Sequence, residues 1–225
     1  MVADGVGGAR GGEEASRLTI QAVTRYLAES VHVYHTVDST DDTAFADEIA
    51  DAALRAHSHV LERREGKRAA TTLTLWIGVW PRIYLVQVGD SRYYVLRDDE
   101  LVQISRDQTV AQELVDEGVL TPEQAEKGRW SHTLSSAIGG AQSKPILTSI
   151  ENGWNHVHLL CSDGLIKHVS NEQIEHRLRT MTSAQQTCEA LLQDALDGGG
   201  TDNITIIVGG AVQTVIRSAA MATPR

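Results

Sequence analysis

The sequence feature that most constrains this chain is an apolar run that ends in an acidic residue followed by glycine. It covers residues 158–164, with the sequence HLLCSDG. Apolar runs this short are typical of buried β-strands. A carboxylate at the end of such a strand is held by a rigid backbone, and the neighbouring glycine lets other groups approach closely. Asp163 is therefore a candidate functional residue.

The same arrangement of a predicted strand end, an aspartate and a glycine occurs three more times. It follows residues 1–3, follows the run 83–88 and precedes the run 203–208, and its aspartates are Asp4, Asp90 and Asp202. A single aspartate beside glycine is more typical of a turn than of a binding site. The fourfold recurrence favours a site, and if these strand ends converge they form a cluster of hard oxygen ligands.

Size and charge limit the possible partners. The chain has 225 residues, which is enough for one large domain with its own core, and we expect a single domain over 1–217 with a frayed tail at 218–225. Its net charge of −10 argues against nucleic acid and acidic membrane surfaces as partners. No stretch has the length of a membrane span, and the start lacks a signal-peptide profile, so we expect a cytoplasmic protein.

Periodicity predicts alternating blocks of helices and strands. We expect helices at 13–28 and 45–60, near 110–118, after Thr121, from Ser170 to Arg179 and after Ser183, with a loop at 31–42. The predicted strands are 71–77, 83–88, 93–96, 101–104, 146–150, 156–161 and 203–212. Short connections between consecutive strands favour antiparallel pairing over a series of parallel βαβ units.

The candidate ligands indicate which metal the site would bind. Carboxylates, backbone carbonyls and water are the ligands that Mg²⁺ and Mn²⁺ prefer, whereas the histidines lie away from these strand ends and disfavour zinc. Two such ions close together lower the pKa of a shared water and hold a phosphoryl group for in-line attack. No protein nucleophile is needed for that chemistry.

Six short segments, taken together and in this order, carry a resemblance to a known family. They are residues 2–8 (VADGVGG), 11–16 (GGEEAS), 71–73 (TTL), 89–92 (GDSR), 161–165 (CSDGL) and 200–203 (GTDN). This ordered set resembles the metal-dependent PPM-type serine/threonine phosphatases, the protein phosphatase 2C family, in its bacterial form, from Val2 to Val212. The resemblance implies an α+β fold, a four-layer αββα sandwich of two packed antiparallel sheets flanked by helices.

The resemblance also implies an activity and a set of roles. It implies hydrolysis of phosphoserine and phosphothreonine in proteins at a binuclear Mn²⁺ or Mg²⁺ centre, in a monomer that works with a Ser/Thr kinase and the substrates of that kinase. The segment after Asp107 resembles a mobile flap. By position, Asp4 resembles the carboxylate that bridges both metals, Gly5 a carbonyl ligand, Asp163 and Asp202 ligands of one core metal, and Asp90 a ligand of a third, weaker metal.

Three departures from the family pattern qualify these expectations. The family's first strand, with an Asn-Glu-Asp-type motif and a phosphate-binding arginine, would precede Met1, so we expect a chain shortened at its N-terminus. Lys167 stands where the family often has aspartate, and a protonated lysine cannot bind a cation, which puts the third metal in doubt. Ala9 stands where the family often has histidine, and its neighbour Arg10 is either a phosphate contact or a solvated loop residue.

Two other functions compete with an active metal-dependent phosphatase. The departures are also compatible with a catalytically impaired relative that binds a phosphoprotein or a kinase. A cysteine-based phosphatase would use Cys161, but that chemistry needs an arginine six residues later, where Lys167 stands, and Asp163 would repel phosphate. Cys161 and Cys188 are otherwise expected to be buried thiols in a reducing compartment.

Overall fold

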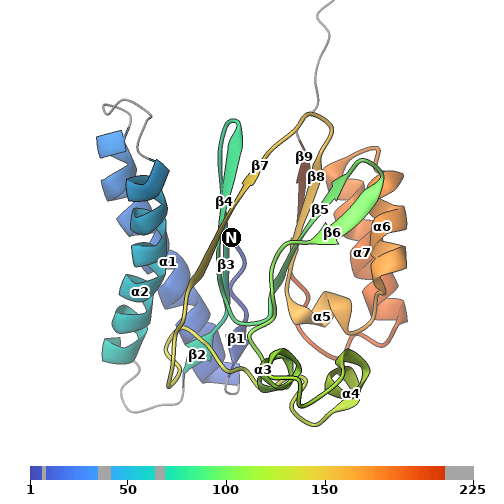
Figure 1. Ribbon diagram of the computed structural model, residues 1–225, viewed down its shortest axis with the longest axis horizontal. Coiled ribbons are helices and arrows are strands. Elements are labelled where there is room, and N and C mark those ends of the chain that lie inside the picture. Colours follow the sequence, from blue (N-terminus) through green and yellow to red (C-terminus); the bar gives the residue numbers. More distant parts are fainter. Residues whose placement is uncertain (7–8, 35–41, 64–68, 211–225) are drawn as a thin grey trace, which may run out of the picture.

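Two antiparallel β-sheets lie face to face between two layers of helices (Figure 1). The computed structural model describes residues 1–6, 9–34, 42–63 and 69–210. The predicted α+β sandwich of four layers is confirmed. The predicted tail at 218–225 and the end of the predicted domain, from 211 to 217, lie outside the described residues.

The first sheet has the strand order β3-β4-β7 and is covered by two long helices. Its side chains alternate: Tyr84, Val86 and Val88 of β4 pack toward the helices, and Leu85 points toward the second sheet. The elements of this half are α1 (Ala9–Tyr34), α2 (Asp42–Arg63), β3 (Leu73–Val79), β4 (Arg82–Val88) and β7 (Ile146–Glu151).

The second sheet has the order β6-β5-β8-β9, and α5, α6 and α7 pack on its outer face. Leu159 and Cys161 of β8 meet Leu165 of α5 and Leu191 of α7 in a buried cluster. The elements of this half are β5 (Arg92–Arg97), β6 (Glu100–Gln103), β8 (Val157–Cys161), α5 (Asp163–Ile166), α6 (Asn171–Arg179), α7 (Ala184–Asp197) and β9 (Ile206–Gly210).

The remaining elements lie at one end of the sandwich. The short strands β1 (Gly5–Val6) and β2 (Ala70–Thr71) pair with each other, and α3 (Val110–Asp116) and α4 (Pro122–Lys127) lie in the connection from β6 to β7. Figure 1 shows α3 and α4 below the ends of the strands, beside α5. None of the helices in the described ranges is long and apolar enough to cross a membrane.

Most predicted elements are confirmed. The helix starts that were predicted from capping residues agree best with the structure. Thr121 and Ser170 each form a capping box with a glutamine three residues later, and the Ser183 hydroxyl caps α7. Each of these starts is set by hydrogen bonds that are local in sequence. Their positions therefore did not depend on knowing the tertiary structure.

Several boundaries differ from the prediction, and one short helix was not predicted. The first helix runs from Ala9 to Tyr34 rather than over 13–28, and α2 begins at Asp42. The predicted loop at 31–42 was therefore wrong over 31–34 and at 42, and 35–41 lie outside the described residues. Extending a formed helix needs little further driving force once it packs against a neighbour, as α1 does against α2. The last strand begins at Ile206 rather than 203, and the single turn of α5 was not predicted.

A buried histidine lies between the two sheets. His158 of β8 lies 2.9 Å from the Tyr93 hydroxyl through its Nδ1, and its ring lies 5.7 Å from that of Trp76 in the opposite sheet. Burial lowers the pKa of His158 to about 4. The imidazole is therefore neutral in the fold over most of the pH range in which a solvated histidine gains its proton.

We predict a pH-dependent stability that originates at His158. Between pH of about 6.5 and 4 the unfolded chain binds a proton at this residue that the folded chain does not, so the free energy of unfolding falls as the pH falls. In His158→Gln this contribution disappears, so on lowering the pH over that range the free energy of unfolding of the variant should fall less, or rise more, than that of the wild type. Urea unfolding at several pH values measures it.

Wild type must be compared with the variant because other titratable groups change the free energy of unfolding in the opposite direction as the pH falls. The raised pKa values of Asp4 and Asp90 make the folded chain bind more protons over part of the same range. Tyr93→Phe removes a hydrogen bond but leaves the imidazole buried, so it should keep the wild-type dependence. Equal pH slopes for wild type and His158→Gln would contradict the prediction.

Candidate active site

Asp163 lies at the junction of β8 and α5, held beside the loop that carries Asp202. The Ser162 hydroxyl donates to the Asn203 carbonyl at 3.1 Å and accepts from the Thr205 amide at 3.0 Å. A Cβ added at Gly164 would come within 2.3 Å of the Asn203 carbonyl oxygen, so only glycine permits this approach. These contacts explain why residues 203–205 precede the strand instead of joining it.

Asp4 is fixed to the edge of the first sheet through its backbone. Its amide donates to Thr72 Oγ1 at 2.9 Å, and its carbonyl accepts from the Thr72 amide and from Thr71 Oγ1, both at 2.8 Å. Thr72 Oγ1 also lies 2.7 Å from Ser91 Oγ, in the connection between the sheets. The two threonines were predicted as strand residues and belong to a segment that carries the family resemblance, but no positioning role was predicted for them.

Asp90 is placed by the turn between β4 and β5. Gly89 before it has a φ of +99°, and a Cβ there would lie 2.7 Å from Thr72 Cγ2. The Gly89 amide donates to Gln108 Oε1 at 2.8 Å, and the Gln108 amide donates back to the Gly89 carbonyl at 3.1 Å. Asp90 is buried, with 7% of its surface exposed.

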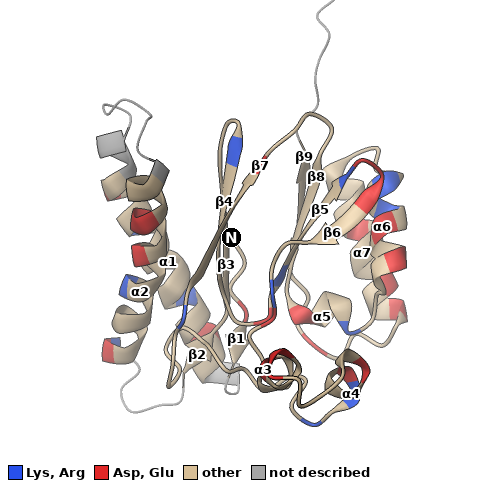
Figure 2. Ribbon diagram, viewed as in Figure 1, with Lys and Arg blue, Asp and Glu red and all other residues tan. Residues whose placement is uncertain are grey.

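The four aspartates form one electrostatic cluster, so the predicted convergence of the strand ends is found. Burial raises the pKa of Asp4 to about 7, helped by the charge and contact of Asp163 and by the charge of Asp202. Burial also raises the pKa of Asp90 to about 7, with repulsion from Asp163 and Asp107. Figure 2 shows acidic segments gathered at this end of the sandwich, at α3, α4 and α5.

A lysine lies between two of these carboxylates. Lys167 Nζ is 2.7 Å from Asp163 Oδ2 and 2.6 Å from Asp202 Oδ2. Its hydrogen bond lowers the pKa of Asp202, and both carboxylates raise the pKa of Lys167 although burial alone would lower it. Within the described ranges, no group of three or more His, Cys, Asp and Glu side chains is arranged to hold a metal ion.

The donor chemistry of the cluster nevertheless fits Mn²⁺ or Mg²⁺. All the candidate side chains are carboxylates, and the buried Oδ1 of Asp163 has no hydrogen-bond partner. A partnerless carboxylate oxygen beside carboxyls with raised pKa values is a site that a hard cation would satisfy. Asp4 and the Oδ1 face of Asp163 are the residues best placed to hold such an ion.

Gly5 adjoins this cluster at the start of β1. It pairs with Thr71, and a Cβ on Gly5 would lie 2.4 Å from the carbonyl carbon of Gly12. This close approach requires glycine at both positions. The role of the Gly5 carbonyl as a metal ligand stays a prediction, and the side chain of Arg10, the possible phosphate contact, lies outside those described.

A cavity of about 580 Å³ opens beside the cluster. Asp90, Asp163 and Lys167 line one side, and residues of α3 and α4 line the other. The segment after Asp107, predicted as a flap, therefore lies over the site. Sequence reasoning missed His132 of this segment, which is exposed, lines the cavity and contributes to the lowered pKa of Asp202. No motif marks such a residue, because only the fold brings it to the cavity.

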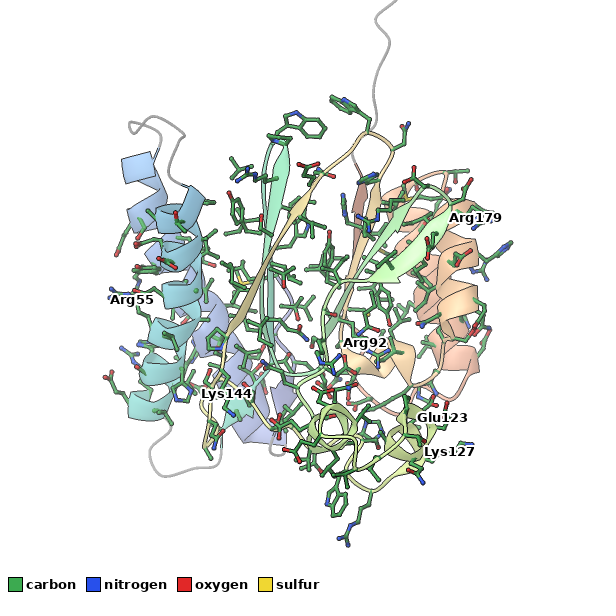
Figure 3. The ribbon with its side chains drawn as sticks, viewed as in Figure 1. Arg55, Arg92, Glu123, Lys127, Lys144 and Arg179 are labelled. Carbon is green, nitrogen blue, oxygen red and sulfur yellow. The ribbon has the colours of Figure 1, made fainter. Side chains whose placement is uncertain are left out.

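Arg92 and Asp107 form a partly buried ion pair on the cavity wall. Arg92 Nη2 lies 2.7 Å from Asp107 Oδ2, and Arg92 Nη1 donates to the Tyr94 hydroxyl at 3.0 Å. Burial would lower the pKa of Arg92, but the bonds and charge of Asp107 raise it above its ordinary value. Figure 3 shows Arg92 beside α5 and Glu123 and Lys127 on α4. The pair ties the start of α3 to the sheet that carries Asp163.

The cysteine chemistry considered above has no support in the structure. Cys161 is fully buried, and burial raises the pKa of its thiol to about 12. A thiol in that state is neither ionised at neutral pH nor reachable by a phosphoprotein. The site is therefore one of carboxylates rather than of a thiolate nucleophile.

Comparison with known proteins gives consistent findings. Residues 1–198 match the family model described as Protein phosphatase 2C. The serine/threonine protein phosphatase PstP of Mycobacterium tuberculosis is 37% identical over 218 residues, covering 94% of this chain and 40% of PstP. The serine/threonine phosphatase stp of Listeria welshimeri is 26% identical, covering 92% of this chain and 82% of that protein. The chain thus spans less than half the length of the PstP sequence.

Solved structures show the same fold. The crystal structure of M. tuberculosis PstP has a TM-score of 0.79 at 36% identity and covers 94% of this chain and 87% of its own. The PstP catalytic domain in complex with two manganese ions has a TM-score of 0.74 at 35% identity, covering 94% of this chain and 86% of its own. The S. agalactiae serine/threonine phosphatase gives 0.81 at 26% identity, with 94% and 86% covered.

We predict that Gly164→Ala destabilises the junction that holds Asp163 beside Asp202. The new methyl group would collide with the Asn203 backbone, and overpacking of this kind lowers the free energy of unfolding by about 1–3 kcal/mol. Gly209→Ala in β9 is the control, since a Cβ there meets nothing within 4 Å. Urea unfolding followed by circular dichroism measures both, and equal effects would show that the close approach is unimportant.

Proposed function

This chain belongs to the protein phosphatase 2C family, and from that premise we propose that it is a metal-dependent serine/threonine protein phosphatase. Its reaction would be hydrolysis of phosphoserine and phosphothreonine at two bound Mn²⁺ or Mg²⁺ ions. The observation that carries the proposal is the gathering of Asp4, Asp90, Asp163 and Asp202 at one end of the sandwich, beside a cavity. The manganese ions of the related PstP domain support the choice of metal.

The four aspartates would bind the metal ions, each in a different role. Asp4 and Asp163 would be ligands of the core ions, and Asp202 would be a further ligand of one of them. Asp90 would be a ligand of a third, more weakly bound ion. When bound, the ions lower the pKa of a water molecule and polarise the phosphoryl group. The Thr72 hydroxyl accepts from the Asp4 amide, and the Ser162 hydroxyl, next to Asp163, donates to the Asn203 carbonyl, so both segments are held by hydrogen bonds.

The substrate would be a phosphorylated segment of another protein. The cavity of about 580 Å³ is open enough for a phosphorylated side chain, and α3 and α4 form the wall against which the flanking peptide would lie. An acidic site repels a phosphate dianion unless cations offset its charge, which ties substrate binding to metal binding. The names of the relatives favour phosphoproteins, and so a Ser/Thr kinase and its substrates as partners. The reading as a non-catalytic binding module gains no support from these relatives.

The decisive experiment is release of phosphate from a phosphothreonine peptide with and without MnCl₂. We expect activity only with the metal, and a loss of more than about hundredfold in Asp163→Ala and in Asp202→Ala, because each removes a charged ligand that no neighbour replaces. Asp51→Ala is the matched control, since Asp51 is an exposed aspartate of α2 away from the cavity and its loss should leave the rate unchanged.

Two results would reject the proposal. One is phosphate release that does not depend on added metal after treatment with a chelator. The other is full activity in Asp163→Ala in a protein that remains folded by circular dichroism. Cys161→Ser should retain activity, because the buried thiol takes no part in the reaction.

A further inference from the structure

The ammonium group of Lys167 lies where two acidic side chains of the site meet. It is 2.7 Å from Asp163 Oδ2 and 2.6 Å from Asp202 Oδ2, so one cation neutralises two carboxylates. The side chains of Lys167 and Asp163 are only 22% and 14% exposed. The contact with Asp163 is therefore stronger than that of an exposed surface pair, whereas the contact with Asp202, whose side chain is 43% exposed, is less shielded.

The backbone fixes the position of this lysine. Lys167 ends α5, and its amide donates to the Asp163 carbonyl at 3.0 Å, so the two residues lie one helical turn apart on the same side. Asp202 reaches the ammonium from a separate loop, which the Ser162 hydroxyl holds through Asn203 and Thr205. The ammonium is therefore positioned by the fold and is not a flexible surface charge.

The surroundings of Lys167 explain why it is held there. Asp4, Asp90, Asp163 and Asp202 place several negative charges close together. Among the described residues that line the cavity, the guanidinium of Arg92 is already paired with Asp107. Lys167, in contrast, forms its ion pairs with two of the four aspartates, Asp163 and Asp202.

We propose that Lys167 is an internal counter-ion of the site, whose ammonium competes with a divalent cation for Asp163 and Asp202. An ion can bind these two carboxylates together only when the ammonium moves away. This inference rests on the proposed function, and it concerns how readily the site takes up its metals. It predicts that the site binds its two metal ions with unequal affinities, because Lys167 lowers the affinity for the second ion.

The geometry separates the two ion positions. The Oδ1 atom of Asp163 is buried without a hydrogen-bond partner, and the ammonium contacts the other oxygen, Oδ2. Asp4 adjoins Asp163, so an ion between them need not displace the lysine. An ion that bridges Asp163 and Asp202 would meet the ammonium at close range, where repulsion between like charges is large and two charge-assisted hydrogen bonds must break.

Calorimetric titration with MnCl₂ tests this directly and needs no enzymatic activity. Wild type should bind one ion more tightly than the second. In Lys167→Gln, which removes the charge and leaves a slightly shorter polar side chain, the weaker ion should bind at least about tenfold more tightly. Lys167→Arg keeps the charge and should stay near wild type.

Lys127→Ala is the control for a simple change in net charge. Lys127 is exposed at the end of α4 (Figure 3) and is not among the described residues that line the cavity. Its loss should change manganese affinity much less than the loss of Lys167. Thermal unfolding with and without MnCl₂ gives a second readout, with a larger stabilisation by the metal in Lys167→Gln than in wild type.

The outcomes separate the inference from the proposed function. Manganese binding by wild type that is unchanged in folded Lys167→Gln would overturn the role of Lys167 and leave the phosphatase proposal standing. Binding of one ion by wild type together with binding of two ions by Lys167→Gln would support the inference in its strongest form. No binding in any of these proteins would overturn the metal-dependent function, and the inference with it.

Discussion

The constraint on which this structure depends is the repulsion among carboxylates gathered at one end of a rigid sandwich. Asp4 and Asp90 are buried close to Asp163, and the pKa of each is raised to about 7. A fold keeps such a group together only if its backbone is held by other contacts and its charge is offset by a cation. In the folded chain Lys167 offsets part of this charge, and divalent ions are the natural source of the rest.

The backbone contacts come from hydroxyl groups at the ends of the strands. Thr72 links Asp4 to Ser91 between the sheets, and Ser162 links the end of β8 to the loop of Asp202. Gly89 and Gly164 let these segments approach more closely than a side chain would allow. The apolar clusters on both outer faces and between the sheets supply the stability that a strained polar site does not.

The fold followed from the sequence wherever the signal was local. The apolar run 83–88 identified a strand, and capping residues such as Thr121 and Ser170 identified helix starts. Boundaries set by packing were missed, as in the extension of α1 to Tyr34 and the late start of β9 at Ile206. In these cases the deciding contacts come from segments far away in the chain, which periodicity does not report.

The sequence by itself identified the four candidate aspartates, because an aspartate beside glycine at a strand end can be recognised from its neighbours. The sequence also showed that Lys167 departs from the family pattern, since a protonated lysine cannot bind a metal ion as an aspartate does. Only the tertiary structure decided that the four aspartates meet, that Cys161 is out of reach, and that His132 lines the cavity. It also decided that the Lys167 ammonium joins Asp163 to Asp202, because charges separated by 35 residues interact only when folding brings them together.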